Sequence, residues 1–307
     1  SANCARFCGA TIDFVDINPN TGLMSMTKLE EKLIIAKKKD LLPKILIPVH
    51  LCGTSCNMKK IFEFSEKYGF SIIEDASHAI GAKFLNKPIG NCEFSDITVF
   101  SFHPVKIITT GEGGAATTNN KKLAEKMSSL RTHGIIKQRD KMKNDNGFGS
   151  WYYEQQDLGF NYRLTDFQAA LGINQLSRLD AIIKKRHSIF NHYEKLLIHT
   201  PVKLLETPKN TYSSFHLCVI RLKNESATFH KNVFEYLRSR QIGVQLHYLP
   251  VHLHPYYRDL GFKEGDFPEA ELYATNAISI PIFPGLTSKK LEYIVSNIND
   301  SINNFSN

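Results

Sequence analysis

The first half of the chain alternates short apolar runs with segments whose apolar residues recur at helical spacing. The run Ile45-Leu46-Ile47-Pro48-Val49 is typical of a strand that is buried on both faces of a parallel sheet. A helix is predicted after it, over residues 58–68. The other strands predicted in this half cover residues 11–15, 71–74, 96–102 and 114–118. Strands that alternate with helices indicate an α/β fold with a largely parallel sheet and flanking helices.

Two helix starts carry the capping-box pattern, in which the N-cap residue and the third helical residue satisfy each other's backbone donors. Thr27 with Glu30 opens a helix predicted to end near Lys39, and Thr165 with Gln168 opens a long helix. The elements predicted after the long helix are strands over 214–222 and 244–248 and helices over 229–239 and 288–302. We therefore expect a large α/β domain over residues 1–165. A long connecting helix and a smaller C-terminal α+β domain should follow over residues 166–307.

Composition is that of a soluble protein. Of the 307 residues, 42% are hydrophobic and 22% are charged, and no apolar run approaches the ~20 residues that cross a bilayer. Lysine and arginine exceed the acidic residues by eight (38 − 30), which suits an anionic cofactor and an anionic substrate. The basic residues are scattered along the sequence rather than gathered into one stripe. We expect a cytoplasmic protein with neither a nucleic-acid nor a membrane partner.

Six cysteines raise the question of a zinc site. Cys52 and Cys56 follow a predicted strand, and His50 lies beside them. Structural zinc sites usually combine C-x2-C or C-x4-C pairs, whereas this pair is spaced C-x3-C and no matching second pair completes a ligand set. The sequence therefore predicts free thiols and no metal.

Side chains capable of chemistry follow three of the predicted strands. In an open α/β sheet, ligands bind beyond the carboxyl ends of the strands, so these side chains should face one cleft. The residues expected there are His50, Asp75, His78, Ser101, His103 and Lys106.

A lysine on a loop beside a carboxylate at a neighbouring strand end is the minimal set for pyridoxal 5′-phosphate (PLP) chemistry. The amine of Lys106 can bind the cofactor aldehyde covalently and later move a proton. The carboxylate of Asp75 can keep the pyridine nitrogen protonated, which makes the ring an electron sink. Ser101 can donate to the phosphate, and the glycines between residues 111 and 114 let the backbone turn tightly past the lysine.

Taken one at a time, these residues also fit ordinary structural roles. A strand-end aspartate is often a turn residue, and a loop lysine is usually a solvated surface charge. His78 and His103 can be histidines of the core. A third interpretation, an NAD-dependent enzyme on a similar sheet, is disfavoured because the chain lacks the G-x-G-x-x-G spacing of a dinucleotide site.

Several motifs in order are more specific than any single residue, and together they resemble the DegT/StrS family of sugar-nucleotide aminotransferases. The resemblance runs from the first residues to the last predicted helix. The motifs include Ile73-Glu74-Asp75-Ala76-Ser77-His78, Phe100-Ser101-Phe102-His103-Pro104-Val105-Lys106, Asn161-Tyr162-Arg163-Leu164-Thr165-Asp166-Phe167-Gln168 and His247-Tyr248-Leu249-Pro250-Val251-His252.

The resemblance implies a fold type I PLP-dependent transferase, working as a homodimer with active sites at the subunit interface. Carried over by matching position, Lys106 is the catalytic, cofactor-binding lysine and Asp75 is the partner of the ring nitrogen. His78 is expected near the phenolic oxygen of the cofactor and Ser101 at its phosphate. Asn161 is expected to reach the phosphate of the neighbouring subunit's cofactor.

The residues of these motifs are most similar to those of the PseC-like branch of the family. That branch moves an amino group to C4 of a UDP-linked 4-keto-6-deoxy-N-acetylhexosamine, and the resemblance implies glutamate as the amino donor. The residues that we expect to contact the nucleotide sugar are His103, Tyr248 and His252.

Family members carry a segment before the position that matches Ser1, with a helix start that supplies phosphate donors. We expect this chain to be a fragment of an active enzyme. The alternative is a truncated or non-catalytic homologue that acts as a binding or regulatory module. The intact set of Lys106, Asp75, Ser101 and Asn161 favours the enzyme.

Overall fold

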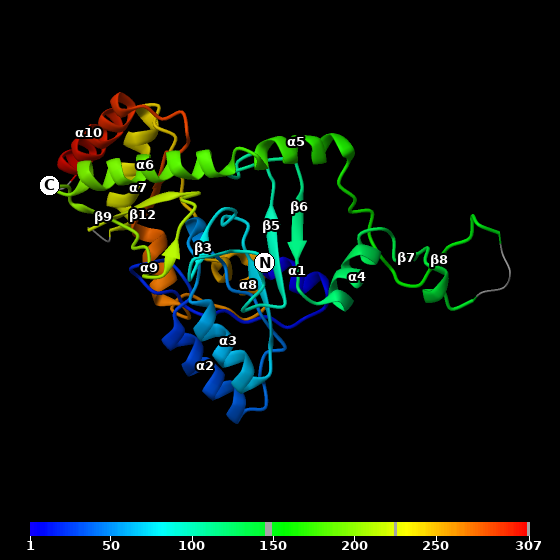
Figure 1. Ribbon diagram of the computed structural model, residues 1–307. Helices are drawn as coiled ribbons and strands as arrows, with labels where there is room; N and C mark the ends of the chain where they lie inside the picture. Colours follow the sequence, from blue (N-terminus) through cyan, green and yellow to red (C-terminus); the bar gives the residue numbers. More distant parts are fainter. Residues whose placement is uncertain (145–148, 224–225, 306–307) are drawn as a thin grey trace.

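A four-stranded sheet lies at the centre of the computed structural model, which describes residues 1–144, 149–223 and 226–305. Its order is β1-β2-β5-β6, where the first three strands are parallel and β6 is antiparallel (Figure 1). The strands are β1 (Ile45–Leu46), β2 (Ser71–Asp75), β5 (Ile97–Ser101) and β6 (Gly114–Thr117). This arrangement agrees with the largely parallel sheet that the apolar runs predict.

Two helices pack together below this sheet, α2 (Met26–Lys38) and α3 (Met58–Tyr68) (Figure 1). The apolar residues of α3 recur every three or four positions, which places one stripe of the helix in the core. Gly69 ends α3 in the left-handed conformation, with φ of 77°. The core between these helices and the sheet includes Leu29, Leu33, Met58, Ile61, Phe64 and Ile72.

A second core lies in the C-terminal part of the chain. An antiparallel sheet of order β12-β11-β9 packs there against three helices. The elements are β9 (Val202–Leu204), β11 (Cys218–Leu222), β12 (Ala277–Ile280), α6 (Leu179–Leu197), α7 (Ala227–Ser239) and α10 (Ser288–Phe305). Tyr193 of α6 is fully buried in this core, and its hydroxyl donates to the carbonyl of Pro281 at 2.9 Å. The division at residue 165, between a large and a small domain, stays a prediction.

An arm extends from the central sheet on the side away from the C-terminal core (Figure 1). It comprises α4 (Lys121–Leu130), β7 (Ile135–Ile136) and β8 (Glu154–Gln155), and the chain returns from it into α5 (Asp166–Leu176). The capping box predicted at Thr165 and Gln168 is confirmed, with both reciprocal hydrogen bonds present. Yet α5 buries none of its side chains.

The remaining elements are short and connect these parts. They are α1 (Ala2–Phe7), β3 (Lys83–Phe84), β4 (Lys87–Pro88), β10 (Thr211–Tyr212), α8 (Pro255–Arg258), α9 (Pro268–Asn276) and the 3₁₀ turns η1 (Leu51–Gly53), η2 (Arg139–Lys141) and η3 (Val251–Leu253).

Four local predictions were wrong. The long helix predicted to open at Thr165 is two helices, α5 and α6, which are separated at Ser177 and Arg178. No strand forms over residues 11–15, where Phe14 packs instead against the rings of Tyr257 and Phe262. The predicted strand 244–248 is reduced to one bridge between Gln245 and Ser279. The helix α2 is capped by Ser25 and not by the predicted Thr27, because the Ser25 hydroxyl accepts from the N–H of Lys28.

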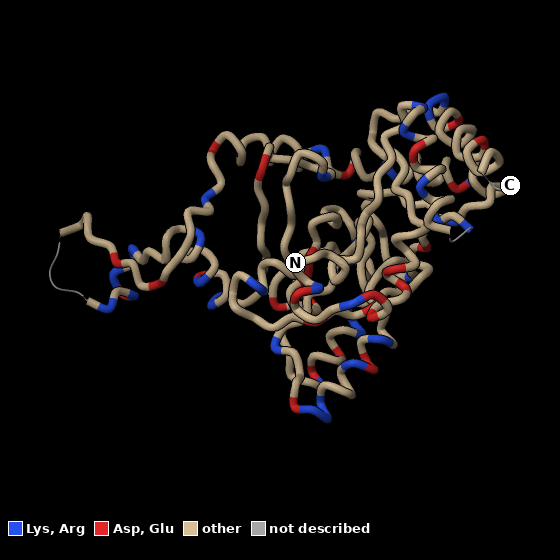
Figure 2. Tube along the Cα trace, turned by 180° about the vertical axis from the view of Figure 1, so that it is seen from behind, with Lys and Arg blue, Asp and Glu red and all other residues tan. Residues whose placement is uncertain are grey.

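Charged residues of both signs are interspersed over the surface, and no single basic stripe is visible (Figure 2). Within the described residues, no helix is both long enough and apolar enough to cross a membrane.

Truncating the core below the sheet should destabilise the fold strongly. Ile61 of α3 is fully buried, so Ile61→Ala should cost about 3 kcal/mol of unfolding free energy through lost burial and a residual cavity. Lys59→Ala, on the exposed side of the same helix, is the matched control and should stay within about 0.5 kcal/mol of the parent. Denaturant unfolding at constant pH measures both, and equal losses would contradict the packing described here.

Candidate active site

Asp75 is the last residue of β2, at the carboxyl end of the parallel strands. Its backbone N–H donates to the carbonyl of Pro48 at 2.9 Å, and its register partner on β5 is Val99. The carboxylate accepts from the Ser1 hydroxyl and from the N–H of Ser77, the latter at 3.0 Å. Burial acts to raise the pKa of Asp75, but these hydrogen bonds outweigh it and lower the pKa below its ordinary value. The carboxylate is therefore ionised at neutral pH.

Lys106 lies on the loop between β5 and β6. The loop is closed at its base by a hydrogen bond of 2.8 Å from the N–H of Phe102 to the carbonyl of Gly113. Ile107 and Ile108 are buried beside the lysine and anchor the loop in the interior. A side chain at Gly113 would bring a Cβ to 2.3 Å from the Thr110 hydroxyl, so only glycine fits there. The loop therefore holds Lys106 in one place.

The surroundings of Lys106 favour the neutral, reactive form of its amine. Burial lowers its pKa below the ordinary value of a lysine, although the negative charge of Asp75 acts in the opposite direction. A lowered pKa increases the fraction of neutral amine, which is the nucleophilic form. The structure thus brings together Lys106 and Asp75, as the sequence predicts.

His78 is buried next to this pair. Burial and the positive charge of Lys106 lower its pKa to about 3, against the opposing effect of Asp75. Among the described residues, the buried Nδ1 atom of His78 has no hydrogen-bond partner. Its ring centroid lies 4.4 Å from that of His216. An unsatisfied ring nitrogen at this position leaves a polar group available to a bound ligand.

Sequence reasoning missed His216 and the residue that holds it. The guanidinium of Arg186 donates through Nη1 to the carbonyls of Phe215 and Ile282, both at 2.9 Å, and to that of His216 at 3.3 Å. Burial and the neighbouring positive charges, among them Lys106 and Arg186, lower the pKa of His216 to about 2. No local motif marks either residue, since their contacts join distant parts of the chain.

A third histidine near the lysine is His247. It belongs to the motif over residues 247–252, but the sequence predicts no role for it. Its Nδ1 lies 2.8 Å from the Ser279 hydroxyl. Burial and the charge of Lys106 lower its pKa. Tyr248 follows it and is half-exposed, and burial together with the negative charge of Asp75 raises the pKa of its phenol. The pKa values of both side chains therefore depend on the charges of the site.

Two further predicted residues lie around the lysine loop. Ser101 ends β5, and its hydroxyl accepts from the N–H of His103 at 3.4 Å. The His103 ring is exposed, and its Nε2 lies 3.7 Å from the carboxylate of Glu112. Asn161 is exposed on the segment that leads to α5, where its backbone pairs with Thr132.

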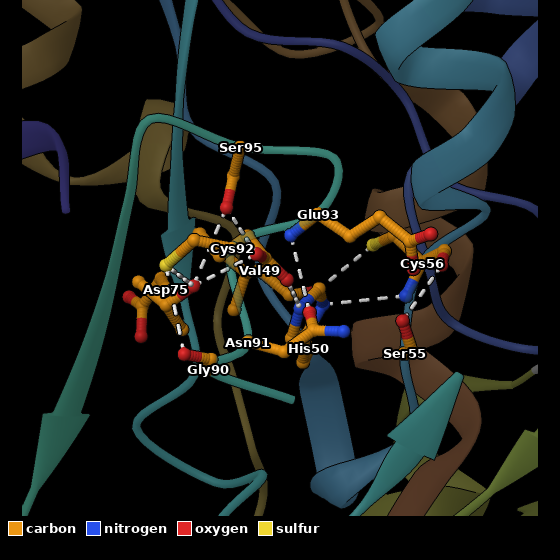
Figure 3. Close-up of polar contacts among 12 residues, drawn as sticks. Val49, His50, Ser55, Cys56, Asp75, Gly90, Asn91, Cys92, Glu93 and Ser95 are labelled. Carbon is orange, nitrogen blue, oxygen red and sulfur yellow. Dashed lines mark hydrogen bonds and ion pairs between the residues drawn. The ribbon is translucent and has the colours of Figure 1, made fainter. Parts of the chain in front are cut away.

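The expectation that His50 lines the cleft was wrong. Its ring is fully buried, and Nε2 lies 2.7 Å from the carboxylate of Glu74, the neighbour of Asp75 on β2 (Figure 3). Successive residues of a strand point to opposite faces, so His50 lies on the other side of the strand from the Asp75 carboxylate. No group of three or more His, Cys, Asp and Glu side chains in the described ranges could hold a metal ion.

His252 is also engaged in the interior. Its side chain is 3% exposed, and its Nε2 lies 2.8 Å from the carboxylate of Glu271. The ring packs against Phe267 with a centroid distance of 4.8 Å. These contacts leave His252 no open face for a substrate, so we do not retain it as a substrate-binding residue.

Comparison with known proteins agrees with this geometry. The family model of the DegT/DnrJ/EryC1/StrS aminotransferase family matches residues 1–299. The chain belongs to this family. A relative from Campylobacter jejuni, UDP-4-amino-4,6-dideoxy-N-acetyl-beta-L-altrosamine transaminase, is 36% identical over 298 residues, which are 96% of this chain and 74% of that protein.

Two solved structures are similar over nearly the whole chain. PseC of Helicobacter pylori, an aminotransferase involved in the biosynthesis of pseudoaminic acid, has a TM-score of 0.87 and 29% identity, covering 99% of this chain and 77% of that one. The PLP form of Spr1654 from Streptococcus pneumoniae has a TM-score of 0.86 and 25% identity, covering 99% and 78%. The predicted fold class, enzyme class and PLP cofactor are thereby confirmed.

The residues present fit this cofactor. An ionised Asp75 suits a protonated ring nitrogen, and the amine of Lys106 has a lowered pKa. Among the described residues, the buried Nδ1 atoms of His78 and His216 have no hydrogen-bond partner, so a bound ligand can supply one.

The buried histidines should make stability depend on pH. His78 and His216 stay neutral in the folded chain until about pH 3 and 2, whereas unfolded histidines bind protons near pH 6.5. Between these values the unfolded state binds more protons, so stability falls as pH falls, by up to about 1.4 kcal/mol per pH unit for each histidine. His216→Phe should therefore lose less stability than the parent between pH 7 and 5 in denaturant unfolding. Equal slopes for the two proteins would contradict this account.

Proposed function

We propose that this aminotransferase moves an amino group from glutamate to the C4 keto carbon of a UDP-linked 4-keto-6-deoxy-N-acetylhexosamine, using Lys106 and Asp75. The observation that carries the catalytic part is the pairing of an amine of lowered pKa with an ionised carboxylate at adjacent strand ends. When bound, PLP supplies an electron sink that allows the amino group and a proton to move between donor and acceptor.

The roles of the two central residues follow from their charges. Lys106 binds the cofactor through Nζ and later holds and moves the proton at the reacting carbon, for which a neutral amine is needed. Asp75 accepts a hydrogen bond from the protonated ring nitrogen, since its carboxylate is ionised and fixed by Ser77.

The surrounding residues complete the proposed cofactor site. His78 would lie beside the cofactor ring and, as a neutral imidazole, would donate or accept near the phenolic oxygen without adding a second positive charge. Ser101, at the end of β5, would donate to the phosphate, and Asn161 would reach the phosphate of a neighbouring subunit's cofactor. His103 and Tyr248, which flank the site on exposed segments, contact the nucleotide sugar.

The substrate proposal is supported by two relatives. Besides the altrosamine transaminase of Campylobacter jejuni, GDP-perosamine synthase of Escherichia coli O157:H7 is 31% identical over 300 residues. The higher identity to the UDP-sugar enzyme favours a UDP-linked acceptor. A net charge of +8 suits this anionic substrate. We place the reaction in the cytoplasm, where a freely dissolved donor and acceptor can meet the enzyme.

We also propose a homodimer, joined through an apolar surface on and before α5. Large contiguous apolar patches mark interaction sites on soluble proteins. Phe167 is 91% exposed and Ile173 is 71% exposed, and both belong to α5, which buries none of its side chains. The exposed apolar side chains of this α5 surface are Leu158, Phe160, Tyr162, Leu164, Phe167, Leu171, Ile173 and Leu176. Asn161 lies within it, so one interface would join both subunits to each cofactor.

Replacement of the lysine tests the catalytic proposal. With added PLP, the parent should develop the visible absorption band of covalently bound cofactor, and glutamate should bleach it. Lys106→Ala should form no such band and should lose the glutamate half-reaction by at least about a thousandfold, because both covalent binding and proton transfer are removed. Lys106→Arg keeps the positive charge but cannot bind the aldehyde, and should fail equally.

The outcomes separate the enzyme from a non-catalytic homologue. A parent that binds PLP without a band, or a Lys106→Ala variant that retains the band and the half-reaction, would contradict the proposal. Once the half-reaction is established, UDP-linked and GDP-linked 4-keto sugars, offered to the aminated enzyme, test the acceptor. A preference for the GDP-linked sugar would refute the UDP-linked choice.

Replacement on the α5 surface tests the dimer. Phe167→Glu should weaken association by roughly 30-fold or more, because a buried interface aromatic is replaced by a charge. Ile198→Glu is the matched control: Ile198 is 72% exposed at the end of α6, outside the α5 surface. Light scattering across a dilution series measures both. A monomeric parent, or equal effects of the two variants, would contradict this interface.

A further inference from the structure

A buried polar cluster that includes His50 and Ser95 lies close to Asp75 (Figure 3), and Glu74, the neighbour of Asp75 on β2, joins its members. One carboxylate oxygen of Glu74 lies 2.7 Å from Nε2 of His50. The other accepts from the hydroxyl of Ser95 and, at 2.8 Å, from that of Thr98 on β5. Glu74 therefore joins the strand that carries Asp75 to both of its neighbours in the sheet.

Nε2 of His50 carries the hydrogen that the Glu74 carboxylate accepts, at 2.7 Å, and the N–H of Cys56 donates to Nδ1 at 3.2 Å. Burial acts to lower the pKa of His50, but its side-chain hydrogen bonds and the negative charge of Glu74 outweigh burial and raise the pKa to about 9. Burial acts to raise the pKa of Glu74, but the hydrogen bonds from His50, Ser95 and Thr98 outweigh it and lower the pKa. The cluster is thus an ionised carboxylate with three donors.

His50 holds residues 74 and 75 at two points. Its side chain donates to Glu74, and its backbone N–H donates to the carbonyl of Asp75 at 3.0 Å. On the same side, the N–H of Asp75 donates to the carbonyl of Pro48 at 2.9 Å. Because neighbouring residues on a strand point to opposite faces, holding Glu74 inward directs the Asp75 carboxylate outward.

Stability alone does not account for such a cluster. Burying a charge costs free energy, and well-packed apolar side chains at the same positions are often as stable or more so. Apolar packing does not fix the orientation of the last residues of β2. On the β1 side, only Ile45 and Leu46 pair with β2 as regular strand residues. A hydrogen-bonded cluster provides that direction.

We propose that His50 and Glu74 are positioning residues that aim the Asp75 carboxylate at the ring nitrogen of the cofactor. This inference rests on the proposed role of Asp75. Loss of the hydrogen bond between His50 and Glu74 loosens the end of β2, so that Asp75 no longer keeps the ring nitrogen protonated. The affinity for PLP then falls by about tenfold, as expected when a charge-assisted hydrogen bond is weakened.

The test compares three variants of the cluster with a histidine control. His50→Phe removes the donor, Glu74→Gln removes the charge with little change in shape, and His50→Gln keeps an N–H near the place of Nε2. His230→Phe is the control, because His230 is also partly buried and bonded, at 2.9 Å, to the carbonyl of Ala277 in the C-terminal sheet. PLP labelled with ¹⁵N in its ring reports the protonation of the bound cofactor by NMR. Amide hydrogen exchange at Asp75 reports the strand end without cofactor.

The expected result is a protonated ring nitrogen in the parent, in His230→Phe and in His50→Gln, and a loss of protonation in His50→Phe and Glu74→Gln. The Asp75 amide should exchange faster in those last two variants. If His50→Phe does not fold, Glu74→Gln decides the question. Cluster variants that keep both the ring proton and the slow exchange would overturn the inference.

Asp75→Asn separates this inference from the proposed function. If that variant also keeps the ring protonated, then the proposed role of Asp75 itself is wrong. If Asp75→Asn loses the ring proton while Glu74→Gln keeps it, Asp75 acts as proposed and the positioning role of His50 and Glu74 is refuted.

Discussion

The parallel pairing of β2 with β5 is the constraint on which the rest of the site depends. It sets the end of β2 beside the end of β5, so that Asp75 and the loop that carries Lys106 leave the sheet at the same edge. The negative charge of Asp75 then acts to raise the pKa of the Lys106 amine, but burial outweighs it and lowers that pKa. If the register slipped by one residue, Glu74 would take the place of Asp75 at the end of β2. The Asp75 carboxylate would then point to the opposite face of the sheet.

Around this pair the protein gathers positive and neutral groups in a buried space. Arg186 donates only to backbone carbonyls among its described contacts, and two histidines nearby remain neutral because burial and neighbouring charges oppose their protonation. Such a site is unfavourable for the chain alone, since within the described residues the buried Nδ1 atoms of His78 and His216 have no hydrogen-bond partner. A bound cofactor with polar atoms can supply such partners. The electrostatics and the family assignment therefore point to the same ligand.

Much of the fold could be predicted from the sequence because its signals are local. The apolar stripe of α3, the capping box at Thr165 and the run that ends at Asp75 each specify their element within a few residues. The predicted strand 244–248 failed because its apolar residues pack between distant segments and Gln245 alone pairs with Ser279. Local patterns do not contain such contacts.

The same limit applies to the site. Lys106, Asp75 and His78 could be found because motifs mark them, and the structure brings them together. His216 could not, because Arg186 of α6 contacts its backbone carbonyl from a distant part of the sequence. The exposed apolar side chains of α5 show a different limit: the sequence predicts that they are covered but not by what, and nothing in the described part of the chain buries them.

The most direct measurement is to locate the cofactor on the chain. Protein loaded with PLP is treated with borohydride, which makes the link to lysine permanent, and is then digested and mapped by peptide mass spectrometry. The account predicts the pyridoxyl group on Lys106 and on no other lysine in stoichiometric amount. A label spread over several surface lysines, or concentrated on a different one, would contradict it.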